Sequence, residues 1–199
     1  APDGARLLVL LDQVRSFVCA EQPADPDVVR AFVRDHLALA RRVRGVTWRG
    51  DWPALMGPAC AAAPALRAAL RMVDAPGEAA EVTLALAEMY ELQGLVLRAR
   101  ELHDEAAPRC EGAPPALAFA LSLARVTCER YGSAVAEALA RAVALEASLD
   151  AASPVDRAVY GNTRSALLRA SGRFDEALAW ARRGVIDALD AGSRALAAN

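Results

Sequence analysis

Apolar residues recur every three or four positions along most of the chain, and alternation of the strand type is almost absent. This pattern predicts a series of α-helices. The first clear helix follows Asp25, a residue type that suits a helix N-cap, and places Pro26 at the first helical position. The helix is predicted to continue to about Arg44, with an apolar stripe from Val29 to Ala40, and Gly45 is expected to end it.

The segments on either side of this helix are less regular. Ala5–Leu10 is a short apolar run that fits either a strand or the start of a helix. Asp12 is a suitable N-cap for a short helix that ends near Ala20. Glycines and prolines at positions 50–58 predict an irregular stretch, which is followed by a helix over about Ala61–Val73.

From residue 78 onward the pattern repeats as three pairs of helices, each joined at a glycine. These glycines are Gly94, Gly132 and Gly172, which lie 38 and then 40 residues apart. The predicted helices cover about Glu78–Gln93, Leu95–Ala107, Pro115–Tyr131, Ser133–Leu149, Val155–Ser171 and Arg173–Ala191. Such a period is typical of stacked helical hairpins, because one hairpin cannot bury its apolar face without a neighbour.

Composition supports an all-α chain and excludes several classes of function. Of the 199 residues 55% are hydrophobic and 24% are charged, and all 23 basic residues are Arg. The net charge of −2 provides no overall field to attract nucleic acid, so we expect no direct nucleic-acid binding. No apolar run reaches the roughly 18 residues that a membrane span requires, and no signal peptide opens the chain. We therefore expect a cytoplasmic protein without membrane contact.

The four cysteines and two histidines have no spacing that is typical of a zinc site. They are Cys19, Cys60, Cys110, Cys128, His36 and His103. We interpret the cysteines as reduced thiols on helix faces. His36 is expected to be a core or interface residue, with a ligand or switch role as the alternative, and His103 to lie on a solvated acidic face.

The last helical pair resembles a tetratricopeptide repeat (TPR). Its turn reads G-x-F-x-E-A, from Gly172 through Phe174 to Ala177. The resemblance implies that Phe174 packs between the two helices and that Ala177 lets them approach closely. The first pair repeats the motif with Tyr90, Gly94, Ala99 and the dipeptide Leu86-Ala87, whereas the middle pair has Ala134 in place of the aromatic residue.

The N-terminal part resembles the region that follows the ATPase of bacterial STAND (NB-ARC-like) regulators of LuxR or SARP type. Leu10–Glu21 is similar to the "LLETVREYALE" segment that closes their winged helix, His36–Arg41 to "FLALAE" and Leu66–Leu70 to "NLRAAL". The chain departs from that pattern at His36, which replaces an aromatic residue, and at Ala62 and Ala65, which replace an acid and an Asn.

This resemblance implies a domain order and a fold. Residues 1–22 would end a winged-helix subdomain, leaving a short remnant of it in this chain. Residues 23–75 would form a connecting helical layer, and residues 76–199 an α-α superhelix of TPR-like hairpins. We expect the chain to be a region of a longer protein. ATP would then bind only in a missing upstream domain, and no cofactor in this part.

The resemblance also implies a binding groove, since the first helices of TPR hairpins line a concave face. The candidate groove residues are Glu81, Leu84, Glu88, Glu91, Asn162, Ala166 and Arg169. A protein or peptide, the parent ATPase core included, or a small effector would bind there, and an ordinary solvated face is the alternative reading.

No P-loop, G-x-S-x-G motif or acidic metal cluster occurs in the sequence, so we expect no catalytic and no metal-binding residues. The preferred hypothesis is a non-catalytic sensor or protein-interaction arm of a signalling ATPase that regulates transcription. A constitutive scaffold or oligomerisation module is the alternative. A ligand-processing helical enzyme is a third hypothesis, and it requires a deep pocket with a strongly perturbed acid or histidine.

Overall fold

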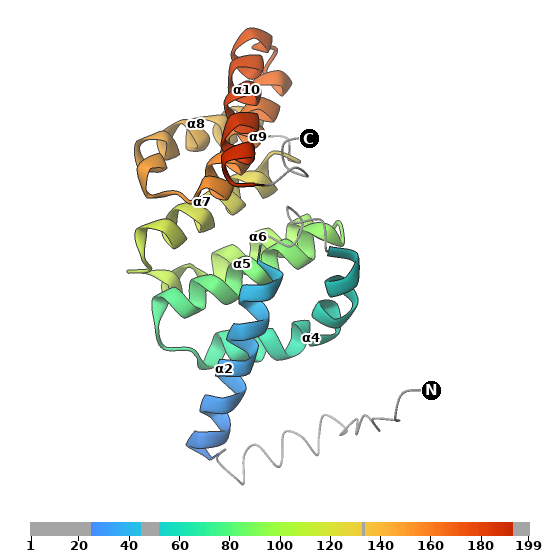
Figure 1. The fold of residues 1–199 in the computed structure, drawn as a ribbon, viewed down its shortest axis with the longest axis vertical. Helices are drawn as coiled ribbons and strands as arrows, with labels where there is room; N and C mark the ends of the chain where they lie inside the picture. The colour runs from blue at the N-terminus through green and yellow to red at the C-terminus, as the bar shows by residue number, and fades with distance from the viewer. Residues whose placement is uncertain (1–24, 45–51, 133, 193–199) are drawn as a thin grey trace.

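The computed structural model describes residues 25–44, 52–132 and 134–192, with the side chains of the second helix described from residue 57 onward. The described residues form eight α-helices and contain no strand, which confirms the all-α class for this part of the chain (Figure 1). The α-helices are α2 (Pro26–Val43), α4 (Trp52–Met72), α5 (Pro76–Leu92), α6 (Val96–Ala106), α7 (Pro115–Glu129), α8 (Val135–Leu145), α9 (Pro154–Ala170) and α10 (Phe174–Asp190). Two 3-10 helices, η1 (Ala107–Cys110) and η2 (Glu146–Ala151), continue α6 and α8.

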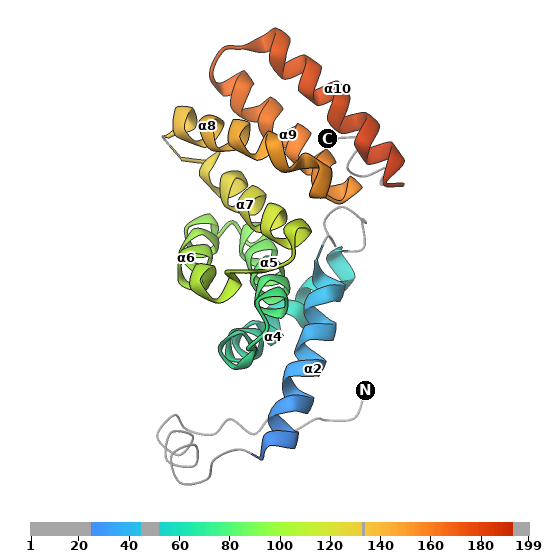
Figure 2. The ribbon, with the colours of Figure 1, turned by 90° about the vertical axis from the view of Figure 1, so that its left-hand side faces the viewer.

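The helices pack in antiparallel pairs that follow the chain: α2 with α4, α5 with α6, α7 with α8, and α9 with α10. The first helix of each later pair also contacts both helices of the pair before it. Thus α5 contacts α2 and α4, α7 contacts α5 and α6, and α9 contacts α7 and α8. The pairs are therefore stacked in chain order (Figure 2). The three predicted pairs are confirmed, and α2 and α4 pack as a fourth.

The predicted start of α2 is confirmed. The Asp25 side chain accepts a hydrogen bond from the backbone N–H of Asp27 at 2.8 Å, and Pro26 opens the helix. At the other end of α2, Arg44 Nη2 lies 3.5 Å from Asp156 Oδ2 at the start of α9. This ion pair joins the first helix pair to the last. The predicted elements within residues 1–22 lie outside the described residues.

The irregular stretch predicted over residues 50–58 is wrong from residue 52 onward, because α4 begins at Trp52 and continues through Gly57 and Pro58. A proline inside a helix removes one backbone hydrogen bond and crowds the residue before it. Gly57, which lacks a Cβ, precedes Pro58, but Ala63 precedes Pro64, so α4 accommodates an interior proline at both positions while it packs against α2 and α5.

Two of the three predicted hinge glycines make the same turn. Gly94 and Gly172 both have a φ of +75°. The next residue of each turn donates its N–H back across the turn, Leu95 to Tyr90 O at 2.8 Å and Arg173 to Leu168 O at 2.9 Å. Glycine reaches this left-handed region without a Cβ penalty. Gly132 does not have a positive φ, so the middle hinge is a different turn.

The middle pair ends earlier than predicted, whereas α6 of the first pair ends at Ala106, close to the predicted Ala107. The helix expected over Ser133–Leu149 ends at Leu145, and the tighter helix η2 takes the chain on to Ala151. In the same way α6 gives way to η1 at Ala107, and Gly112 at a φ of +81° follows it. A short 3-10 turn is a common way to end an α-helix, since it satisfies some of the terminal carbonyls.

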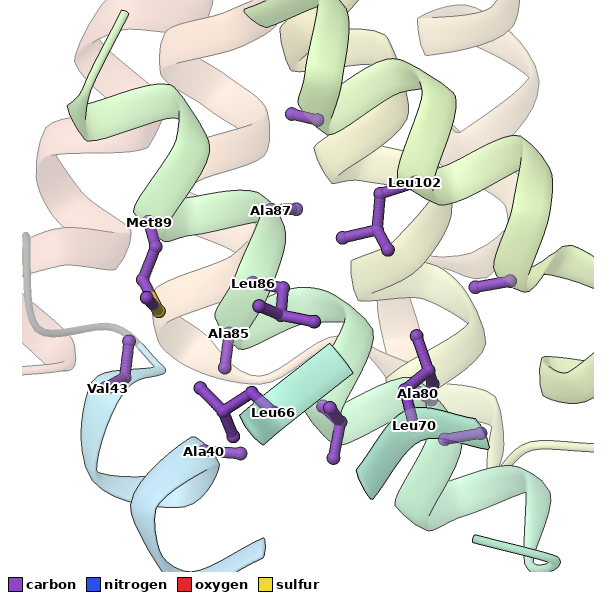
Figure 3. Close-up of a cluster of buried hydrophobic side chains, with 14 of the residues drawn as sticks. Ala40, Val43, Leu66, Leu70, Ala80, Ala85, Leu86, Ala87, Met89 and Leu102 are labelled. Carbon is purple, nitrogen blue, oxygen red and sulfur yellow. The ribbon is translucent and has the colours of Figure 1, made fainter. Parts of the chain in front are cut away.

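The largest apolar cluster joins α2, α4, α5 and α6 (Figure 3). Leu66 of α4 and Leu86 of α5 are fully buried within it. Ala40 and Val43 of α2 are also buried there, beside α5. Small residues are frequent in this cluster, and they let the helices approach closely. Burial of a leucine side chain contributes about 2 kcal/mol, so this cluster is the main apolar contribution to the first two pairs.

The last pair is held by an unusually close backbone contact. A Cβ placed on Gly161 of α9 would lie 2.8 Å from the Cα of Gly184 in α10, so these two helices cross glycine on glycine. Ala177 is buried at the same interface, as predicted. The prediction for Phe174 is wrong, because its side chain is 66% exposed. The aromatic residue of α10 that packs against α9 is Trp180, whose ring centroid lies 5.3 Å from that of Tyr160.

Candidate interaction surface

The predicted groove residues near the start and middle of α5 face neighbouring helices. Glu81 Oε2 accepts a hydrogen bond from Arg41 Nε of α2 at 2.8 Å. Leu84 is buried, and Glu88 is partly buried. Glu81 and Leu84 therefore take part in the packing of α5, and a binding role for these three residues stays a prediction.

Glu91, near the end of α5, contacts α7. Its Oε1 accepts a hydrogen bond from Cys128 Sγ at 3.2 Å. Burial raises the pKa of the Glu91 carboxyl to about 7, with a further contribution from Glu88, while the Cys128 thiol and Arg130 act in the opposite direction. Burial and the neighbouring Glu91 raise the pKa of Cys128. The Cys128 thiol therefore contacts a Glu91 carboxyl that keeps its proton to a higher pH than an ordinary glutamate.

The predicted groove residues of α9 share one face of that helix. Asn162 and Ala166 are partly buried and Arg169 is exposed. Helix α7 contacts both α5 and α9 and lies between them (Figure 2). The α5 set and the α9 set are thus separated by a helix, and a ligand common to both would have to span α7.

His103 does not lie on a solvated face. It is only 6% exposed, and burial lowers its pKa to about 4, with a further contribution from Arg125 of α7. Its Nε2 has no hydrogen-bond partner among the described residues. The acidic neighbours are exposed as expected, and Asp104 pairs with Arg125. The exposed acidic residues around His103 suggested an exposed histidine, but the His103 side chain points into the protein.

The other histidine and the cysteines pack without any metal arrangement. The His36 ring lies 4.1 Å from that of Phe32, between ring centroids, and its Nδ1 lies 2.8 Å from Phe32 O. Cys60, Cys110 and Cys128 are free, and Cys19 lies outside the described residues. In the part of the chain that the structure describes, no three His, Cys, Asp or Glu side chains gather as a metal site would require. None of the helices described is both long and apolar enough to cross a bilayer.

A hollow of about 410 Å³ lies between α7 and η2. Its lining includes Phe119, Leu145, Ser122 and the carboxylate of Asp150. A ligand site usually combines an apolar lining with several polar groups that converge on one point. Two serines, Ser122 and Ser148, and one carboxylate in an otherwise apolar lining do not make such a set.

The most exposed apolar surface of the described chain lies on α10. Phe174, Leu178, Ile186 and Leu189 are each more than half exposed, and Val185 is 38% exposed. They recur at helical spacing, so they form one stripe along the helix, which we call the α10 stripe. The buried residues of α10 are small ones, Ala177, Gly184 and Ala188, and α9 is the helix that α10 contacts. Trp180 packs against Tyr160 of α9, whereas the residues of the α10 stripe lie outside the packed face.

The second helix of the preceding pair shows how such a stripe is covered. On α8, Leu139 and Ala142 are buried in a cluster with Leu167 and Leu168 of α9. Helix α9 therefore covers the apolar side of α8, as α7 covers α6 and α5 covers α4. No described helix takes this place on α10, which lies at the end of the stack (Figure 1).

The sequence predicts the apolar stripe of α10, but it does not predict that the stripe is exposed. Phe174, Leu178, Val185 and Leu189 recur as regularly as the residues of α8 that are buried. A periodic stripe predicts only that a helix has one apolar side. Whether another helix covers that side depends on the position of the helix in the stack, which the structure supplies.

Comparisons with known proteins return no matching family model, no similar curated protein and no similar solved structure.

Proposed function

We propose that this chain is a non-catalytic protein-interaction arm of a larger signalling ATPase, of the kind that regulates transcription in bacteria. The observation that supports it best is the α10 stripe at the end of a stack of paired helices. Exposed apolar patches on otherwise well-packed proteins mark sites of protein contact. The residues that resemble STAND regulators supply the link to an ATPase.

In this proposal the four helix pairs form a TPR-like superhelix, and the parent ATPase core is one of its partners. The arm would favour either a closed or an open arrangement of the parent protein, depending on what it binds. A partner shifts this equilibrium only by the difference between its affinities for the two arrangements. The contact that α10 makes must therefore differ between them.

The proposal is tested with the separately produced upstream ATPase core of the full-length protein. Size-exclusion chromatography with light scattering measures whether the 199-residue chain binds that core, and a coupled assay measures ATP turnover with and without the chain. We expect a one-to-one complex and a lower turnover. Absence of a complex together with unchanged turnover would contradict the proposal.

A scaffold or oligomerisation module is the second candidate, because an uncovered apolar stripe also suits self-assembly. It predicts a stable oligomer of the chain alone that is indifferent to the ATPase core. The same light-scattering experiment separates the two candidates, since a monomer that binds the core is incompatible with a constitutive scaffold.

A further inference from the structure

The α10 stripe carries one basic residue near its centre. Arg182 lies one helical turn from both Leu178 and Ile186, and its side chain is exposed. Among the described residues Arg182 forms no ion pair. A helix that covers the α10 stripe must therefore accommodate this guanidinium, and burial of an unpaired charge is costly. The charge on the partner at this point is thus constrained.

Helix α6 has a charged residue at the position equivalent to Arg182, and α7 packs over that helix. Asp104 lies ten residues after the turn glycine Gly94, as Arg182 lies ten residues after Gly172. Asp104 Oδ1 forms an ion pair with Arg125 Nη2 of α7, at a distance of 2.9 Å. On α10 the sign of the charge is reversed. A helix that covered α10 in the same way would carry a carboxylate where α7 carries Arg125.

A second copy of α10 does not fit this requirement. In an antiparallel arrangement that sets Leu178 against Val185 of the other copy, the two Arg182 side chains lie next to each other. Like charges at a contact are unfavourable and act against that pairing. Helix α2 is also unsuitable as the cover, because its outer face exposes charged residues such as Arg30, Arg34 and Asp35.

We propose that α10 docks an amphipathic α-helix of another protein or domain, which presents aliphatic side chains to Phe174, Leu178 and Ile186 and a carboxylate to Arg182. This inference rests on the proposed function, since it specifies what kind of partner the interaction arm takes. It continues outward the arrangement in which α9 covers α8. The apolar contact would supply affinity, and the ion pair would select the partner.

Two synthetic peptides test the proposal. Each has about 20 residues, long enough to hold a helix, with leucines at helical spacing along one side. The acid-centred peptide has a glutamate at the middle of that side, and the base-centred peptide has a lysine there instead. Fluorescence anisotropy of labelled peptide measures binding to the 199-residue chain. We expect the acid-centred peptide to bind roughly three- to fivefold more tightly, as for a partly exposed ion pair.

Variants of the chain separate the two contributions. Arg182→Glu should invert the preference between the peptides. Leu178→Glu combined with Ile186→Glu should weaken binding of both by at least about tenfold. Leu97→Glu is the matched control, because Leu97 is exposed on α6, outside the stripe, and should leave binding unchanged. All these positions are exposed, and circular dichroism with urea unfolding checks that each variant folds.

Several outcomes would overturn the inference. They are failure of both peptides to bind, equal binding of the two by the unaltered chain, and a preference that persists in Arg182→Glu. A dimer of the chain alone that dissociates in the Leu178→Glu, Ile186→Glu variant would make a second copy the occupant. A chain that binds the ATPase core but neither peptide refutes this inference and leaves the proposed function standing. Peptide binding as expected without a core complex refutes the ATPase link alone.

Discussion

The first two helix pairs and the last two are held together by different kinds of contact. In the first two pairs one continuous apolar cluster extends through α2, α4, α5 and α6. In the last two pairs the apolar residues form three smaller clusters. There the contacts include the glycine crossing of α9 and α10 and several buried polar groups. The stack is therefore uniform in its order of helices but not in its chemistry.

The polar contacts of the last two pairs surround α9. Tyr160 Oη donates a hydrogen bond to Ala142 O at 2.9 Å and accepts one from Arg164 Nη1 at 2.7 Å. The Arg164 guanidinium lies 4.1 Å from the centroid of the Trp180 ring. Thr127 and Thr163 meet at 3.1 Å between their hydroxyl oxygens. Helix α10 is attached through Ala177, Gly184, Ala188 and the partly buried Trp180, while the residues of the α10 stripe remain exposed.

The largest effect is expected in the apolar cluster of the first half. Leu66→Ala removes a fully buried side chain, and we expect it to lower the free energy of unfolding by about 3 kcal/mol. Urea unfolding followed by circular dichroism measures the change. The control is Leu97→Ala on exposed α6 surface, which should cost less than about 0.5 kcal/mol. Equal losses in the two variants would show that the cluster does not stabilise the first half.

A smaller but sharply located effect is expected at the glycine crossing. Gly161→Ala would place its Cβ 2.8 Å from the Cα of Gly184, so the helices must separate, at a cost of about 2 kcal/mol. Ser122→Ala is the control, because the Ser122 side chain is exposed on α7, away from the crossing, and should cost less than about 0.5 kcal/mol. Hydrogen exchange should show α9 and α10 opening more often in the first variant only. Unchanged exchange in α10 would argue against the crossing as its anchor.

The third prediction concerns pH at the junction between the second and third pairs. Glu91 has a folded pKa of about 7 against an ordinary value of 4.5, so its contribution to stability is lost as pH rises from about 4.5 to 7. His103 acts in the opposite direction, since its folded pKa of about 4 means that stability is lost as pH falls from 6.5 toward 4.

Glu91→Gln separates these two contributions. The variant should gain stability relative to the unaltered chain between pH 5 and pH 8, on the order of 1 to 2 kcal/mol after allowance for partial exposure. Urea midpoints at pH 5, 6.5 and 8 measure the difference. The matched variant Glu88→Gln should leave most of the slope in place. If Glu91→Gln has the same pH dependence as the unaltered chain, Glu91 is not the group that titrates.

The smallest effect is expected for the polar contacts around α9. Tyr160→Phe removes the hydroxyl that donates to Ala142 O and accepts from Arg164, and should cost about 1 kcal/mol. Thermal unfolding monitored through the Trp180 environment measures it. Ser122→Ala is a suitable control, because its exposed hydroxyl bonds only to Ala118 O within its own helix. A neutral result for Tyr160→Phe would mean that the aromatic packing of Tyr160 matters and its hydroxyl does not.

Helix positions and turns could be predicted from the sequence because they depend on local chemistry. The cap at Asp25 and the left-handed turns at Gly94 and Gly172 follow from the side chains at those positions. The continuation of α4 through Gly57 and Pro58 was missed, because glycine and proline usually interrupt a helix and nothing local in the sequence shows that this one continues. Residues whose environment comes from distant helices were also predicted wrongly.

Phe174 and His103 illustrate this limit. Phe174 was expected between α9 and α10 and is exposed, whereas Gly161, Gly184 and Trp180, which lie farther from the turn, make the contacts between these helices. His103 was expected outside and is buried, since α7 covers its side of α6. The candidate surface depends on such long-range packing in the same way. The apolar period of α10 could be read from the sequence. The exposure of its stripe could not, because it depends on α10 being the last of the described helices in the stack.

Hydrogen–deuterium exchange of the whole chain, with and without saturating acid-centred peptide, tests the central claim most directly. If the interaction surface is the α10 stripe, bound peptide should slow exchange of the amides of α10 and leave α5 unchanged. Protection centred on the α5 residues Glu81 to Glu91, or no protection anywhere, would contradict the account.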